Sequence, residues 1–438
     1  MLKRKLSRLL PCMIISFTLV FSASSGFSAS VADSQQLKSQ IDNSKKISSF
    51  DSAKSETALF SSVENDVKKV IKANTDFAFD IFKAINLEDS EKNVLISPLS
   101  ISTALSMVYQ GAGGSTRGEM ETAMRYNGLD INTINRAYGS LLPYLRNIDP
   151  DVNLGISNSI WYRNRFNINS SFLQINRNIF NSHVEAIDFG SHGAINTINS
   201  WVANATNGMI PQMLNAPIPS QTVMYLINAL YFKGRWTNVF DETLSFNGNF
   251  RTGKNEYKSI VYMKKTDTMD YGQGEDYKAI RLPYGSGSTA MYCILPDDGV
   301  SINDYIISLN TQKWNQIRQS IENTEDVKLI LPRFKIEYGE ISLNNALAAL
   351  GMEEAFLPGA NFSGIAPGIF ISRINHKALI EVNENGTEAA AITAGVLFGS
   401  TPPPDNEFIA TRPFIFVIAD EGKGNILFMG KAFELSQY

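Results

Sequence analysis

Residues 383–408 have the sequence NENGTEAAAITAGVLFGSTPPPDNEF, in which a run of alanine, threonine and glycine is followed by three prolines. Alanine is a strong helix former, whereas the β-branched Ile392 and Val396 are better suited to a strand. The segment is therefore ambiguous between helix and strand. Because successive side chains of a strand lie on opposite faces, a strand here would carry only small residues on one face: Thr387, Ala389, Ala391, Thr393 and Gly395. Such a face could fit between two neighbouring strands.

The composition is that of a globular protein rather than a disordered one, because 44% of the 438 residues are hydrophobic and 19% are charged. The chain is long enough for one large domain or two of medium size. The formal net charge of −4 and the sequence pI of about 5.6 give no overall positive field. Nucleic acid is therefore not an expected partner.

Residues 1–32 have the layout of a secretory signal peptide. Basic residues within positions 3–8 precede an apolar run at 9–21, and small residues follow as far as Ala32. Cleavage after Ala29 or Ala32 would release a secreted, extracellular chain in which Cys293 is the only cysteine, so no intramolecular disulfide could form. The alternative is a membrane anchor, but the apolar run is shorter than the roughly 20 residues that a spanning helix needs. No membrane span is expected after cleavage.

Residues 33–65 are rich in serine, lysine, glutamine and aspartate, which predicts a flexible spacer before the folded unit. Apolar residues then recur at helical spacing over 67–85, so an amphipathic helix is expected to open the domain. The pair Ser97-Pro98 predicts the start of a second helix. Residues 116–119, Thr-Arg-Gly-Glu, match a capping box and predict the start of a third.

Strand patterns dominate the second half. Residues 223–232 are almost continuously apolar, which predicts a strand buried on both faces, although a buried helix fits the same pattern. Strands are also predicted at 326–337 and 376–382, and 414–428 is predicted to be a hairpin whose turn holds Gly422 and Gly424. One mixed α+β domain is therefore expected over residues 66–438.

Motifs of known enzymes are scarce. His183, His192 and His376 are far apart in the sequence and none belongs to an HExxH motif, so no zinc site is predicted. The chain also lacks a G-x-S-x-G elbow and the glycine-rich loops that bind phosphates or dinucleotides. A secreted hydrolase would need a nucleophile that the sequence does not identify. Asn228 and His376, both in predicted strands, are expected to be internal polar groups that need hydrogen-bond partners.

Five segments, taken in order, resemble the serpins, a family of serine-protease inhibitors. They lie at residues 93–120, 227–236, 331–352, 374–394 and 412–434, and the fourth contains GTEAAA, which is similar to the hinge of that family. The similarity spans about 66–438 and leaves the spacer outside. It implies an α+β serpin fold, a single domain of about nine helices and three β-sheets with an exposed reactive loop after the hinge.

The resemblance also implies a mechanism in which the chain is not an enzyme but a suicide substrate. A target protease would attack the loop, and its serine would become acylated. The cleaved loop would then insert into the main sheet as an extra strand and distort the protease before the ester hydrolyses. On this interpretation Thr387, Ala389, Ala391 and Thr393 face inward, where large or charged groups would be costly, and Glu388 faces outward. The expected assembly is a monomer that forms a covalent complex with one protease and needs no cofactor.

The similarity carries over to individual positions. The hinge would comprise Glu384, Gly386, Thr387, Glu388, Ala389, Ala390 and Ala391. A polar cluster beneath the centre of the main sheet, called the shutter in this family, would comprise Ser97, Ser100, Asn228 and His376. The breach, where insertion begins, would hold Trp236 together with Arg333 and Glu384, which match a pair that can form a salt bridge. Two solvated charges worth about 0–1 kcal/mol are the alternative interpretation of that pair.

The reactive bond is predicted by counting from Glu384 as the family does, which gives Ser400-Thr401. Counting back from Pro413 moves it to Pro402, where proline disfavours cleavage, and Phe398-Gly399 is the second choice. Residues 385–411 contain no lysine or arginine. A trypsin-like target is therefore disfavoured, because its acidic specificity pocket binds a basic side chain. The predicted target is an elastase- or subtilisin-like serine protease.

The sequence also bears on an alternative function and on the source of the protein. A non-inhibitory serpin fold used for binding or chaperoning is the main alternative, and the small hinge residues count against it. Asn385-Gly386-Thr387 is an N-glycosylation sequon, and a glycan there would hinder insertion of the loop. We interpret this as a hint of a host without such glycosylation, and a prokaryotic source is expected.

Overall fold

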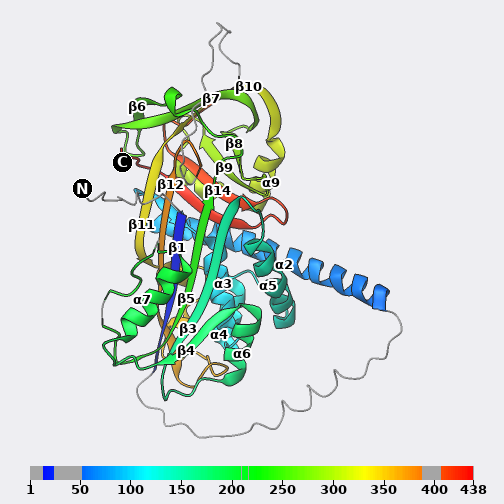
Figure 1. Ribbon diagram of the computed structural model, residues 1–438, viewed down its shortest axis with the longest axis vertical. Helices are drawn as coiled ribbons and strands as arrows, with labels where there is room; N and C mark the ends of the chain where they lie inside the picture. The colour runs from blue at the N-terminus through cyan, green and yellow to red at the C-terminus, as the bar shows by residue number, and fades with distance from the viewer. Residues whose placement is uncertain (1–12, 24–51, 209, 216, 387–405, 438) are drawn as a thin grey trace, which may run out of the picture.

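The computed structural model describes residues 13–23, 52–208, 210–215, 217–386 and 406–437, and it has the expected α+β class (Figure 1). Within these residues no helix is both long and apolar enough to cross a membrane. The helices of the first half are α2 (Ser52–Glu88), α3 (Pro98–Tyr109), α4 (Gly114–Ala123), α5 (Ile131–Arg146), α6 (Ser170–Ile179) and α7 (Ala194–Ala205). Those of the second half are α8 (Ile302–Ser308), α9 (Thr311–Ser320), α10 (Asn344–Ala349) and the 3-10 turns η2 (Glu242–Leu244) and η3 (Glu354–Phe356).

The first sheet has six strands in the order β11-β12-β1-β5-β3-β4. Their bounds are β1 (Met13–Ala23), β3 (Val152–Arg163), β4 (Ser182–Ile187), β5 (Thr222–Gly234), β11 (Phe334–Ser342) and β12 (Ile369–Val382). The segment 223–232 is thus a strand rather than a helix, and it is buried along nearly its whole length, as predicted. The expected strand at 376–382 is the second half of β12.

The second sheet has the order β13-β10-β7-β8-β9-β14-β15-β2, with β6 paired to β7. Its strands are β2 (Val94–Ile96), β6 (Phe246–Arg251), β7 (Tyr257–Gln273), β8 (Tyr277–Tyr284), β9 (Thr289–Pro296), β10 (Glu322–Pro332), β13 (Asn406–Ile409), β14 (Phe414–Asp420) and β15 (Ile426–Ala432). The expected three sheets correspond to two hydrogen-bonded networks among the described residues. The reason is β7, which pairs with β6 and β10 over most of its length and with β8 at its end.

The main core lies between the first sheet, the second sheet and the helices of the first half. Helix α3 packs against β1, β5 and β15, so it lies beneath the centre of the first sheet. On the other face of that sheet, α7 contributes Ile198 and Val202 to a smaller cluster with Trp161 of β3 and Ile227 of β5. Figure 1 shows α7 in front of the first sheet and α3 behind it. The central strands are therefore covered on both faces.

Of the two helix starts predicted from capping residues, one agrees with the structure and one differs from it. Ser97 caps α3 as expected, since its hydroxyl accepts a hydrogen bond from the amide of Ser100 at 3.1 Å. The capping box at 116–119 is wrong, because α4 already begins at Gly114. Thr116 instead accepts the amide of Asn361, and Glu119 accepts the amide of Glu353. These side chains join α4 to a distant segment rather than cap it.

The expected spacer at 33–65 also differs in part. Helix α2 begins at Ser52 and continues to Glu88 without a break, and Figure 1 shows its first turns projecting from the body of the molecule. Helical structure therefore begins fourteen residues before residue 66, the predicted start of the domain. Residues 33–51 of the predicted spacer lie outside the described part.

The single strand expected at 326–337 is two strands, because the chain changes sheet at Arg333. Residues up to Pro332 belong to β10 of the second sheet, and Phe334 begins β11 of the first. The amide of Arg333 donates to the carbonyl of Val261 at 2.9 Å. Proline lacks an amide hydrogen and is tolerated where a ladder ends, so Pro332 suits this junction.

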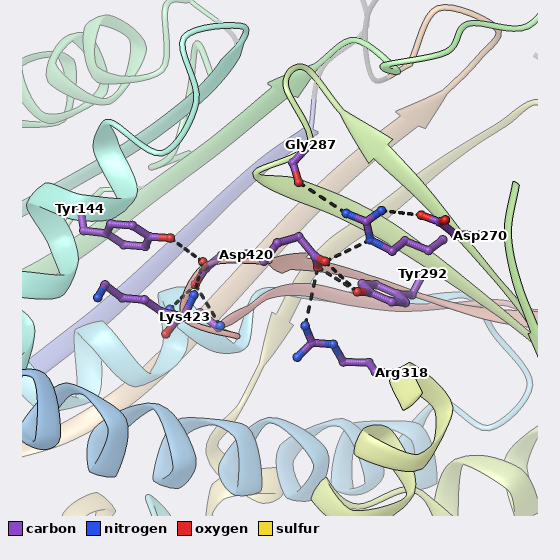
Figure 2. A network of polar contacts seen from close by, with 10 residues as sticks. Tyr144, Asp270, Gly287, Tyr292, Arg318, Asp420 and Lys423 are labelled. Carbon is purple, nitrogen blue, oxygen red and sulfur yellow. Dashed lines mark hydrogen bonds and ion pairs between the residues drawn. The ribbon is translucent and has the colours of Figure 1, made fainter. Parts of the chain in front are cut away.

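The predicted hairpin at 414–428 is present as β14 and β15. Its turn is held by Asp420, whose carboxylate accepts the hydroxyl of Tyr144 from α5 at 2.8 Å. The neighbouring Glu421 accepts the guanidinium of Arg281 at 3.0 Å and the hydroxyl of Tyr292 at 2.8 Å (Figure 2). These contacts fix the second sheet against α5 at the end of the hairpin.

Candidate functional site

The centre of the first sheet holds a strand that comes from the other end of the chain. Strand β1 lies between β5 and β12 and is antiparallel to both. It runs from Met13, opposite Phe232, to Ala23, opposite Ile369. We call the place between β5 and β12 that β1 occupies the β5–β12 slot. Strands β5 and β12 are not neighbours in the described sheet, so the slot accommodates a complete additional strand.

The side chains of β1 alternate between the two faces of the sheet. Phe17, Leu19 and Phe21 are completely buried in the main core, and the ring of Phe21 contacts that of Phe362 edge-on at 5.6 Å. The opposite face carries Ser16, Thr18, Val20 and Ser22, and Val20 packs on the smaller cluster beneath α7. The slot therefore accepts bulky apolar groups on its core face and small groups on the α7 face.

Beneath the slot, α3 and the central strands form a buried polar chain. The hydroxyl of Ser97 donates to the carbonyl of Leu427 at 2.7 Å, and that of Ser100 donates to Asn228 Oδ1. Asn228 Nδ2 donates to Asn158 Oδ1 at 2.6 Å. Three of the four residues predicted for the shutter are thus connected. Asn158 of β3 extends the chain and was missed, because only the pairing of β3 with β5 places it opposite Asn228.

His376, the fourth predicted residue, is not part of this polar chain. Phe17 lies opposite both Asn228 and His376, so the three residues form one row across the sheet. Neighbouring strands are about 4.8 Å apart, and the intervening Phe17 separates the imidazole from the amide by two such spacings. His376 and Asn228, both predicted for the shutter, are therefore not in contact with each other in the structure. Among the described residues neither ring nitrogen of His376 has a hydrogen-bond partner.

The environment of His376 affects its ionisation. The side chain is fully buried, and the ring of Phe17 lies 6.4 Å from the imidazole at an angle of 63°. Burial without a charged partner disfavours the imidazolium and lowers the pKa of His376 to about 3. The imidazole is therefore neutral over the physiological range, and the ring of Phe17 packs against it.

At the end of the slot where β5 and β12 both finish, Trp236 holds the segment that leaves β12. Its indole N–H donates to the carbonyl of Asn383 at 2.9 Å, and its ring stacks on Tyr284 at 4.4 Å between centroids. The amide of Trp236 also donates to the carbonyl of Asn385 at 3.0 Å. The structure thus places Trp236 directly beside the start of the predicted hinge.

Arg333 and Glu384, predicted as a pair, are in contact. The guanidinium Nη2 of Arg333 lies 2.6 Å from Glu384 Oε1, and the hydroxyl of Ser245 donates to the same oxygen at 2.5 Å. Burial alone would raise the pKa of Glu384, whose exposed fraction is 2%, but the hydrogen bonds from Arg333 and Ser245 outweigh it and the pKa is lowered. Glu384 is therefore a partnered buried carboxylate and not a solvated charge.

The last described hinge residue is Gly386. It exchanges two backbone hydrogen bonds with Asn383, at 3.0 and 3.1 Å, which closes a tight turn. It also forms an antiparallel bridge with Arg235, just beyond the end of β5. Its φ of 126° is a conformation that favours glycine. Residues 387–391 of the predicted hinge and both predicted reactive bonds, Phe398-Gly399 and Ser400-Thr401, lie outside the described residues.

Comparison with known proteins assigns the fold around this site. The family model described as "Serpin (serine protease inhibitor)" matches residues 72–435, which contain the polar chain, Trp236 and the Arg333–Glu384 pair. The chain belongs to the serpin family. The serpin fold and the α+β class expected from the sequence are thereby established.

Several serpins are similar over nearly their whole length. The human leukocyte elastase inhibitor is 33% identical over 379 residues, which cover 83% of this chain and 99% of that protein. An uncharacterised serpin-like protein of the archaeon Methanosarcina acetivorans is 30% identical over 368 residues, covering 83% of this chain and 85% of the relative. The thermophilic serpin tengpin in its native state is 33% identical, with a TM-score of 0.76 over 83% of this chain and 94% of tengpin.

For this serpin the comparisons support protease inhibition in general, because the family model and the human relative both carry that description. The described residues contain no group of three or more potential metal ligands. Each residue of the polar chain, and each member of the Arg333–Glu384 pair, contacts a polar partner within the protein. These contacts hold the central strands, α3 and the start of the hinge in place.

Proposed function

We propose that this serpin is a suicide-substrate inhibitor of serine proteases that traps the acyl-enzyme by inserting its cleaved loop into the β5–β12 slot. The observation that carries the proposal is the bridge between Gly386 and Arg235. It places the chain, as it leaves β12, at the mouth of the slot and antiparallel to β5. The slot is able to take an antiparallel strand, because β1 lies there.

Continuing the Gly386–Arg235 pairing gives a specific register for the inserted loop. Seven residues beyond Gly386, Thr393 would lie opposite Asn228, which is seven residues before Arg235. Side chains opposite one another in a sheet share a face. Thr387, Ala389, Ala391 and Thr393 would therefore share the core face with Phe232 and Leu230 of β5.

This register accounts for a small residue at position 387, where the hinge enters the slot. Thr387 would lie opposite Gly234, where even an added Cβ would approach the ring of Tyr284 to 2.9 Å. Glu388 would lie opposite Lys233, on the other face of the sheet, where the pairing of opposite charges is favourable. A large or charged side chain at 387 would have no room, whereas one at 388 would face outward.

The proposed target is an elastase- or subtilisin-like enzyme. Residues 385–411 contain no lysine or arginine, and the count from Glu384 puts the reactive bond at Ser400-Thr401. The similarity to leukocyte elastase inhibitors supports this class of target. We also propose that residues 1–32 are removed on export and that the inhibitor acts outside a prokaryotic cell as a monomer.

The test compares mature wild-type protein with Thr387→Arg and Glu388→Arg, incubated with subtilisin, an elastase and trypsin. Wild type should form covalent complexes that survive denaturing gels with the first two enzymes and none with trypsin. Thr387→Arg introduces an unpaired charge on the core face, where burial is strongly unfavourable, so insertion should be slow and the acyl-enzyme should hydrolyse. It should be cut at Ser400-Thr401 but release active protease.

The control Glu388→Arg carries the same new side chain one residue further on and should keep most of the inhibition, because its side chain would face outward. Mass spectrometry of the released fragment locates the cleaved bond. Equal inhibition by Thr387→Arg and wild type would contradict the proposed insertion. Cleavage of all three proteins without any complex would favour a non-inhibitory serpin.

A further inference from the structure

The occupant of the β5–β12 slot is the apolar segment of the predicted leader. Residues 13–23 pair with β5 from Phe232 to Thr222 and with β12 from Leu379 to Ile369. The register derived above places loop residues 389–397 opposite Phe232 to Met224, which are residues of β5 that pair with β1. The leader segment and the loop therefore require the same backbone partners and cannot be bound together.

The polar groups around the slot fit the two segments differently. With β1 in the slot, several buried polar groups have no hydrogen-bond partner within the described structure. They are the hydroxyls of Ser16 and Thr18 in β1 and both ring nitrogens of His376 in β12. With the loop inserted, Thr393 would replace Phe17 in the row between Asn228 and His376. A threonine hydroxyl both donates and accepts a hydrogen bond, whereas a phenylalanine ring leaves the imidazole of His376 without a partner. The slot is thus a better polar match for the loop than for β1.

Bulky apolar groups hold β1 in the slot nevertheless. Phe17, Leu19 and Phe21 are completely buried, and burial of such side chains is the main favourable term in strand association. Leu19 lies between Leu226 of β5 and Ile374 of β12. The segment is covalently attached, so its effective concentration at the slot is high even through a long connection.

We infer that residues 13–23 and the reactive loop are alternative occupants of the β5–β12 slot, so that a chain retaining its leader in the slot is cleaved as a substrate and does not trap protease. The inference rests on the proposed function. It assigns the leader segment a second role, as an internal competitor that keeps the unprocessed inhibitor inactive. Loss of the segment from the slot activates the protein.

The experiment uses the full 438-residue chain with subtilisin as the probe. Phe17→Asp replaces a completely buried ring with a carboxylate in the row between Asn228 and His376. The lost apolar burial and the cost of burying charge should expel β1 from the slot. The unchanged full chain should be cut at the reactive bond and release active subtilisin. Phe17→Asp should form covalent complexes, with about tenfold fewer inhibitor molecules consumed per trapped protease, the size expected for a shift in slot occupancy.

Two further variants act as controls. Phe17→Leu keeps an apolar side chain and should behave as the unchanged chain. Leu19→Asp acts at the next core-facing position and should reproduce the gain of Phe17→Asp, which keeps the test decisive if one charged variant folds poorly. Equal trapping by the unchanged chain and both charged variants would overturn the inference while leaving the proposed function intact.

A second measurement restores the competitor from outside. A synthetic peptide of residues 13–23, with two lysines added at its carboxyl end for solubility, is incubated with the Phe17→Asp protein before protease is added. The peptide should bind the empty slot and return the protein to substrate behaviour, whereas the same peptide carrying Phe17→Asp should not. Failure of the unmodified peptide to reduce trapping would contradict the shared slot. Absence of complexes in every arm, with cleavage intact, would instead count against the proposed function.

Discussion

At the scale of single residues, the row Asn228–Phe17–His376 determines how the sheet responds to pH. The folded protein does not protonate His376 until about pH 3, whereas the unfolded chain binds that proton near pH 6.5. Between these values the unfolded state binds more protons, so the free energy of unfolding decreases as the pH falls. The loss is about 1.4 kcal/mol for each pH unit below 6.5.

We therefore expect the full chain to lose about 2 kcal/mol of stability through His376 between pH 7 and pH 5. His376→Leu should remove this part of the pH dependence, because the group that takes up the proton is gone. His192→Gln, at an exposed position, is the matched control and should leave the dependence unchanged. Urea unfolding at the two pH values measures the effect, and an equal loss in wild type and His376→Leu would contradict it.

Much of the residue-scale site could be predicted from the sequence. Asn228 and His376 stood out as polar groups in buried strands, and Trp236, Arg333 and Glu384 were placed by resemblance. Asn158 could not be found, since its role depends on which residue of β3 lies opposite Asn228. The separation of His376 from Asn228 was equally hidden, because it depends on a strand from residues 13–23 that composition identified only as a leader.

At the scale of elements, the turn from Asn383 to Gly386 sets the direction in which the loop begins. Gly386 has a φ of 126°, and a Cβ there would approach the carbonyl oxygen of Gly234 to 2.4 Å. The turn therefore requires glycine for both its conformation and its contact with β5. The nearby Arg333–Glu384 pair fixes the same turn to the start of β11.

Gly386→Ala should destabilise the protein by about 1–3 kcal/mol, the cost of a strained backbone conformation, and should slow covalent complex formation because the loop no longer starts in register with β5. The control is Gly339→Ala in β11, where an added Cβ meets no atom within 4 Å. Urea unfolding and the rate of complex formation with subtilisin test both variants. Equal behaviour of the two alanine variants would show that the turn has no such requirement.

Elements with a strong local signal were predictable and those fixed by distant contacts were not. The start of α3 follows from Ser97-Pro98 and the identity of β5 from its apolar run. The start of α4 was misplaced because Thr116 and Glu119 serve the segment around Asn361 and Glu353 instead. The change of sheet after Pro332 depends on pairing partners far away in the sequence.

At the scale of the whole molecule, stability depends on whether the first sheet is complete. An inserted strand adds backbone hydrogen bonds along two neighbours, each worth about 0.5–1.5 kcal/mol. On the proposed mechanism, a chain lacking residues 1–32 has the β5–β12 slot free of β1 before cleavage and filled by the loop afterwards. The full chain already has β1 in place.

We expect cleavage of the mature chain at its loop to raise the melting temperature by more than about 10 °C, given the energy of a complete extra strand. The full chain should melt close to the cleaved mature form even before cleavage, because its first sheet is already complete. Differential scanning calorimetry of both chains, intact and cleaved, measures this. A full chain that melts with the intact mature form would show that β1 contributes little to the sheet.

The stacking of Trp236 on Tyr284 and its hydrogen bond to Asn383 also make the protein its own optical reporter. Indole emission responds to the polarity and hydrogen bonding of its surroundings, and this indole contacts the residue at which the chain leaves β12. Trp161 and Trp201 lie together near α7, and Trp314 lies on α9 against Phe79. Loop entry can therefore be followed in real time by stopped-flow fluorescence without any attached dye, with Trp236→Phe as the blank.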